Sequence, residues 1–137
     1  MSKKKEVIAF LFDLKALLEK EDFDINTDIT LIRKKKIDED EKYSTPYTML
    51  DLEYDVNDVI DRLKELIVSE YSESKIDKDD LNPPLLFVFG KVINNKLVYI
   101  KLKLKDNQQK HVLCVSFHYA KEDMKFPYLQ KELEKEG

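Results

Sequence analysis

Side chains able to move protons and bind phosphate alternate along two β-rich segments near the end of the chain. In the first segment, Tyr99, Lys101 and Lys103 occupy every second position between apolar residues, and in the next segment Ser116 and His118 do the same. Alternate residues of a strand share one face of a sheet. A histidine takes up or releases a proton near neutral pH, and lysines hold phosphates as point charges. This combination suits metal-independent cleavage of RNA, in which the 2′-hydroxyl attacks the neighbouring phosphorus.

Strand pairing decides whether these side chains meet. A turn at residues 94–95 places Gly90 opposite Tyr99. If the following turn is symmetric, Tyr99 also lies opposite Ser116 and diagonally next to His118. The small side chains of Gly90 and Ser116 then leave a shallow groove around Tyr99, with two lysines beside it. The alternative interpretation is an ordinary lysine-rich outer face with a tyrosine packed across it.

These segments belong to a predicted antiparallel meander of three strands, at residues 85–92, 97–104 and 111–118. Each is rich in β-branched and aromatic residues and is separated from the next by turn-forming residues. In the third strand, one alternating set should face the core and the other should face outward. The inward set is Leu113, Val115 and Phe117, and the outward set is Cys114, Ser116 and His118.

Helical spacing of apolar residues predicts two helices that cover this sheet, at about residues 5–20 and 55–68. Asp55 and Asp58 form a capping-box pair at the start of the second helix. A β-branched run predicts a short strand at residues 29–32. Two polar stretches, residues 34–42 and 75–84, predict loops. The fold class is therefore α+β, with an antiparallel sheet packed by N-terminal helices.

The composition indicates one globular domain. The chain has 137 residues, of which 42% are hydrophobic and 38% are charged, with both signs mixed. This composition supports a core and excludes global disorder. The longest apolar runs, residues 7–12 and 85–89, are far shorter than the roughly 20 residues that span a bilayer. No signal-peptide pattern follows the basic start, so we expect a cytoplasmic protein without a membrane partner.

The charge is unevenly distributed. The formal net charge is −4, but residues 91–118 hold six lysines against one aspartate, giving +5, together with both histidines. This stretch is a candidate docking surface for a polyanion, although lysines also simply solvate the outer face of a sheet. The single Cys114 cannot form an internal disulfide, and two histidines are too few for a zinc-like cluster. No metal or cofactor is therefore predicted.

Five short segments, residues 45–53, 68–72, 86–91, 98–102 and 112–118, follow an order that resembles the MqsR family of toxins from type II toxin-antitoxin systems. The likeness covers about residues 43 to 120 and is strongest in Val-Tyr-Ile-Lys-Leu followed by Val-Ser-Phe-His. It implies a RelE-like fold, an α+β layer with an antiparallel sheet. We expect a single domain at residues 1–120, in which residues 1–40 form an N-terminal helical extension. Residues 121–137 are expected to form a C-terminal tail. Members of the family are mRNA endoribonucleases that arrest growth until a cognate antitoxin binds.

The resemblance places the family's catalytic tyrosine on Tyr99 and its basic residue at the end of the last strand on His118. The family's glutamine and lysine fall at about Val88 and near Glu73, so two polar positions of the family are absent here. The predicted catalytic residues are Tyr99, His118 and Lys101, and the predicted RNA-binding residues are Lys91, Lys103 and Ser116.

Three hypotheses about function follow. The leading one is an mRNA interferase toxin that inhibits translation, with mRNA, an antitoxin protein and the ribosome as candidate partners. The second is a non-catalytic binding module that keeps a toxin-like fold and acts through a protein partner, which the residues Glu73 and Val88 favour. A phosphate-binding enzyme of another kind ranks last, because the chain has two glycines, no Gly-rich loop and no nucleophile elbow.

Overall fold

The computed structural model describes residues 1–33, 41–81, 84–106 and 109–129, which form an α+β fold with a five-stranded mixed sheet. In this part of the chain the helices are α1 (Lys4–Leu18), α2 (Thr45–Leu52) and α3 (Val56–Lys64), with 3-10 turns η1 (Glu41–Tyr43) and η2 (Val68–Glu70). The strands are β1 (Ile29–Leu31), β2 (Tyr71–Lys75), β3 (Leu86–Ile93), β4 (Lys96–Asp106) and β5 (Lys110–Tyr119). No helix among the described residues is long and apolar enough to cross a bilayer.

The predicted meander is confirmed, but the expectation of a purely antiparallel sheet is wrong. The strand order is β1-β5-β4-β3-β2, and β1 runs parallel to β5 while all other neighbours are antiparallel. Asp28, just before β1, accepts a hydrogen bond from Gln109 at the start of β5, with 2.7 Å between Oδ1 and Nε2. Both strands therefore start at the same end of the sheet, which makes them parallel.

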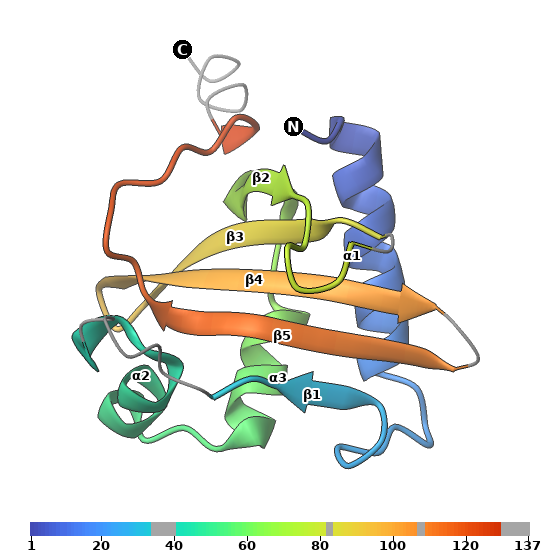
Figure 1. The fold of residues 1–137 in the computed structure, drawn as a ribbon, viewed down its shortest axis with the longest axis horizontal. Helices are drawn as coiled ribbons and strands as arrows, with labels where there is room; N and C mark the ends of the chain where they lie inside the picture. Colours follow the sequence, from blue (N-terminus) through green and yellow to red (C-terminus); the bar gives the residue numbers. More distant parts are fainter. Residues whose placement is uncertain (34–40, 82–83, 107–108, 130–137) are drawn as a thin grey trace.

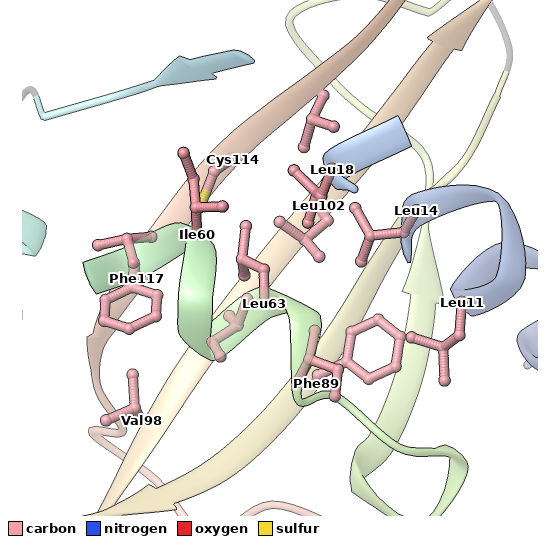
Figure 2. Close-up of a cluster of buried hydrophobic side chains, with 14 of the residues drawn as sticks. Leu11, Leu14, Leu18, Ile60, Leu63, Phe89, Val98, Leu102, Cys114 and Phe117 are labelled. Atoms are coloured by element: carbon pink, nitrogen blue, oxygen red, sulfur yellow. The ribbon is translucent and has the colours of Figure 1, made fainter. Parts of the chain in front are cut away.

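Helices α1 and α3 cover one face of the sheet, as the sequence predicts (Figure 1). Helix α3 begins with the predicted capping box, in which the amide of Asp58 donates to the Asp55 carboxylate at 3.0 Å and the amide of Asp55 donates to Asp58 at 2.9 Å. Figure 2 shows the core between helices and strands, formed by Leu11, Leu14, Leu18, Ile60, Leu63, Phe89, Val98, Leu102, Cys114 and Phe117.

Helix α2, which the sequence patterns did not predict, completes the edge of β5. Strand β1 pairs only with residues 112–114 of β5, so the amides further along need other acceptors. The hydroxyl of Thr45 accepts from the amide of Phe117 at 3.1 Å, and the hydroxyl of Thr48 accepts from the amide of Tyr119 at 3.0 Å. Strand β2 was also not predicted, and most of the predicted loop at 34–42 lies outside the described residues.

Two shifts of one residue each change the predicted register: the turn before β5 pairs Leu104 with Val112, one residue beyond the partner that a symmetric turn gives, and β5 then contains a β-bulge. Lys101 lies opposite Ser116 but Leu102 lies opposite Cys114, so Val115 is an extra residue on β5. The predicted pairing of Tyr99 with Ser116 is therefore wrong, and Tyr99 lies directly opposite His118. The predicted orientation of the side chains is also wrong for the part of β5 before the bulge. Cys114, which was predicted to face outward, is buried in the core. Burial raises the pKa of its thiol to about 12, which keeps the thiol protonated at neutral pH.

The outer face of the sheet, opposite α1 and α3, is largely covered. Leu86 and Val88 on this face are buried, although they lie outside the main core cluster. Lys103 was expected on a wet face, but its side chain is only 1% exposed. Its ammonium group lies 3.3 Å from the Asp77 carboxylate and 3.1 Å from the backbone carbonyl of Asp80. The loop after β2 therefore folds over Lys103 and removes it from solvent.

The burial of Lys103 predicts that this lysine contributes much more to the stability of the fold than the nearby Lys105 does. Lys103→Ala should lower the free energy of unfolding by roughly 3 to 5 kcal/mol, because it leaves buried carboxylate charge without its partner. Lys105, which lies 3.7 Å from Asp80 and is 35% exposed, is the matched control. Lys105→Ala should cost less than about 1 kcal/mol. Urea denaturation followed by circular dichroism measures both, and equal effects would contradict the burial of Lys103.

Candidate functional site

Tyr99 and His118 form an aromatic pair on the outer face. They occupy directly opposed positions on β4 and β5, and their ring centroids lie 5.1 Å apart with an angle of 15° between the planes. Both side chains are half-buried. The prediction that these two residues are neighbours is confirmed, and the shift at the turn together with the bulge places them directly opposite each other instead of diagonally.

The hydrogen bond of His118 fixes which ring nitrogen is available for chemistry. Its Nδ1 lies 2.9 Å from the backbone carbonyl oxygen of Tyr119. A carbonyl oxygen can only accept, so Nδ1 carries the proton when the ring is neutral. The lone pair is then on Nε2, which is the arrangement that a general base requires.

Tyr99 and His118 line a pocket with a volume of about 1130 Å³. The other walls come from Met1, from residues 72–75 of β2 and from residues 121–127 after β5. Strand β2 and the C-terminal segment thus bring groups from distant parts of the sequence to the aromatic pair. The pocket is therefore larger than the shallow groove that the sequence predicts.

Charges of both signs line this pocket. Its positive groups are Lys75, Lys121 and Lys125, and its negative groups are Glu73, Glu122 and Asp123. Lys75 and Glu73 are neighbours on β2, with 3.9 Å between the ammonium nitrogen and a carboxylate oxygen. The lysines can neutralise a bound phosphate, and the carboxylates limit how strongly the empty pocket attracts an anion.

The wall opposite the sheet is the C-terminal segment, residues 121–129. In Figure 1 it rises from the end of β5 past the ends of β4 and β3 toward the N-terminus. Phe126 and Met124 pack onto Gly90 so closely that a Cβ atom there would lie 2.8 Å from the Phe126 ring. Further along, the Tyr128 ring stacks on the Tyr71 ring of β2, with 5.7 Å between the ring centroids. The Tyr128 hydroxyl donates to the backbone carbonyl of Ser2. The segment is therefore anchored at β3, at β2 and near the N-terminus.

The remaining predicted site residues do not line this pocket. Lys101 and Ser116 are next to the aromatic pair on the same face, Lys101 half-buried and Ser116 buried. Lys91 lies on the face covered by the helices, where its ammonium group is 3.3 Å from Glu70 and 3.8 Å from Glu65. Lys103 is covered by the loop after β2. Lys91 and Lys103 therefore cannot bind RNA alongside Tyr99 in this structure.

Lys121 and Lys125 were missed as site residues. The sequence places them in the predicted tail, residues 121–137, and nothing in their spacing shows that this tail crosses the sheet. One signal existed in Gly90, since a glycine inside a strand marks a position where other groups approach closely. The apolar residues Met124 and Phe126 supply that approach.

Within the residues that the structure describes, no group of three or more His, Cys, Asp or Glu side chains is placed to hold a metal ion. Comparison of the chain with protein-family models, with curated proteins and with solved structures gives no match.

The close packing on Gly90 predicts that Gly90→Ala displaces the C-terminal segment. The added Cβ overlaps the Phe126 ring and the Met124 sulfur, and such overpacking costs about 1 to 3 kcal/mol. That cost raises the population of the undocked segment about 5- to 150-fold and speeds trypsin cleavage after Lys121 and Lys125 accordingly.

Limited proteolysis followed by mass spectrometry measures this effect. Val92→Ala is the matched control, because Val92 lies on the same strand and is 66% exposed. Cleavage of the Gly90→Ala protein at the rate of the wild-type protein would show that the segment is not docked on β3.

Proposed function

We propose that this protein is an endoribonuclease that needs no metal and cleaves single-stranded RNA at the pocket of Tyr99 and His118. The observation that carries the proposal is the stacked pair at the pocket, with His118 Nδ1 held by a carbonyl and Nε2 left with the lone pair. Cleavage by the RNA's own 2′-hydroxyl needs only proton transfer and charge stabilisation, and this pocket offers groups for both.

In the proposed reaction, His118 Nε2 accepts the proton of the 2′-hydroxyl as its oxygen attacks the adjacent phosphorus. The new bond joins the 2′-oxygen to phosphorus, and the bond from phosphorus to the 5′-oxygen breaks. Tyr99 gives its hydroxyl proton to the leaving 5′-oxygen, and the proton taken up by His118 returns to Tyr99 through water after the products leave. Lys121 and Lys125 offset the negative charge that builds up on the phosphate oxygens. The products are a 2′,3′-cyclic phosphate and a 5′-hydroxyl.

The biological role that we propose is that of an mRNA interferase toxin. The resemblance to the MqsR family supports this role, and the α+β fold with four consecutive antiparallel strands is compatible with the RelE-like fold that the resemblance implies. In this role the protein acts on mRNA in the cytoplasm and is silenced by a cognate antitoxin, and the ribosome is a further candidate partner.

A non-catalytic binding module is the second candidate. Three observations favour it: Val88 is buried where the family has a glutamine, Glu73 adds a negative charge to the pocket, and the lysines of the pocket are matched by carboxylates. Such a module would use the same outer face to hold a protein partner.

A cleavage assay separates the two candidates. Purified protein is incubated with a long unstructured RNA in the presence of EDTA, and the new ends are mapped. We expect 2′,3′-cyclic phosphate ends, with the rate reduced about 100-fold or more by His118→Ala because the proton acceptor is lost. Tyr99→Phe should reduce the rate by a smaller factor.

His111→Ala is the matched control. His111 lies at the other end of β5, where its ring nitrogens contact Thr30 and the carbonyl of Thr27, and it does not line the pocket. This variant should cleave at the wild-type rate. If folded wild-type protein leaves the RNA intact, or if His118→Ala cleaves as fast as wild type, the proposed nuclease is wrong.

Growth tests the toxin role separately. Induced expression of the wild-type protein should arrest growing cells, and His118→Ala and Tyr99→Phe should each restore growth while accumulating to the same level. Equal arrest by the wild-type protein and both variants, measured by optical density with protein levels checked by immunoblot, would rule out toxicity through this site.

A further inference from the structure

A second pocket lies next to the first and is built mainly from tyrosines and lysines. It has a volume of about 420 Å³, and its walls include Tyr43, Tyr47, Tyr119, Lys42 and Lys96. Residues 121–123 line both pockets. The two pockets are therefore neighbours that share residues 121–123 as a common wall.

Two of the three tyrosine rings in this pocket contact each other. Tyr47 packs edge-on against Tyr119, with ring centroids 6.5 Å apart and an angle of 72° between the planes. The Tyr119 hydroxyl donates to Asp51, and burial together with this hydrogen bond raises the pKa of Tyr119. Tyr47 is 36% exposed, so part of its ring is available to a ligand. The ring contact reduces the side-chain freedom that Tyr47 would lose on binding a ligand.

Lysines lie beside these rings. Lys96 lies 4.8 Å from the centre of the Tyr119 ring and 3.5 Å from Asp51, with its side chain 60% exposed. Lys42 and Lys121 are further cations of the pocket, and Glu122, Asp123 and the neighbouring Asp51 balance the three lysines. The exposed ammonium group of Lys96 is the cation within reach of a bound phosphate. Aromatic surfaces flanked by lysines are the usual means of binding single-stranded nucleic acid, since bases stack and phosphates pair with ammonium groups.

We infer that the second pocket binds a nucleotide of single-stranded RNA that flanks the cleaved bond, with its base against Tyr47 and a phosphate at Lys96. The inference rests on the proposed ribonuclease function and adds a binding site to it. It implies that the protein binds RNA longer than a dinucleotide more tightly than it binds the dinucleotide itself.

Fluorescence anisotropy with a labelled single-stranded oligoribonucleotide tests this inference. The 2′-positions are methylated, which removes the attacking hydroxyl and keeps the probe intact. Tyr47→Ala should weaken binding about 5- to 150-fold, which is the effect of losing one stacked base. Leu50→Ala, on the same helix and 79% exposed, should leave the affinity unchanged. Binding of a methylated dinucleotide should be equal in all these proteins.

Salt dependence gives a second readout. Lys96→Gln should lower the slope of log Kd against log salt by about 0.7, as expected for one lost phosphate contact on a single strand. Lys5→Gln removes the same charge from helix α1, which lies on the opposite face of the sheet from the Tyr99–His118 pair. This variant should not change the slope.

The outcomes separate the inference from the proposed nuclease when the cleavage assay is run in parallel. If RNA is cleaved but Tyr47→Ala and Lys96→Gln bind the probe like wild type, the second site is wrong and the nuclease stands. Tight binding that depends on Tyr47 and Lys96, without cleavage, supports the site and overturns the nuclease. If the folded protein neither binds nor cleaves RNA, both are wrong.

Discussion

One extra residue in the last strand, Val115, determines how the outer face is built. Without this bulge, strict alternation would place Cys114 on the same side as Ser116 and His118. With it, Cys114 before the bulge and Phe117 after it both face the core, while His118 faces outward directly opposite Tyr99. The core and the aromatic pair therefore depend on the same local irregularity. This agrees with the general tendency of bulges to re-aim side chains next to functional sites.

The outer face becomes a pocket because the C-terminal segment crosses it. Gly90 allows Phe126 and Met124 to approach the backbone of β3, and the contacts of Tyr128 with Tyr71 and Ser2 hold the far end of the segment. This arrangement brings Lys121 and Lys125 to the site in place of the lysines on the strands. The cations of the site thus come from a segment held by side-chain packing, whereas the aromatic pair is held by the hydrogen-bonded sheet.

The sequence predicted the features that depend on local periodicity and capping. The three-strand meander, α1, and the capped start of α3 follow from alternating or helical patterns that hold over many residues. The pairing of Tyr99 with His118 was predicted only as a diagonal contact, because neither the register at the turn before β5 nor the bulge leaves a clear mark in the sequence pattern. Helix α2 and the burial of Lys103 depend on long-range partners, namely the amides of β5 and the loop carboxylates. Such partners cannot be identified from neighbouring residues alone.

If Tyr99 and His118 form the reactive centre, RNA must reach His118 Nε2. Nitrogen-detected NMR of the histidine rings, recorded with and without a 2′-methylated single-stranded RNA, tests this directly. In the protein alone we expect the proton of the neutral His118 ring on Nδ1, as its contact with the Tyr119 carbonyl requires. Added RNA should then shift His118 Nε2 and the Tyr99 ring while leaving His111 unchanged. Unchanged His118 and Tyr99 signals at saturating RNA, or the proton of the neutral ring on Nε2, would contradict the proposed centre.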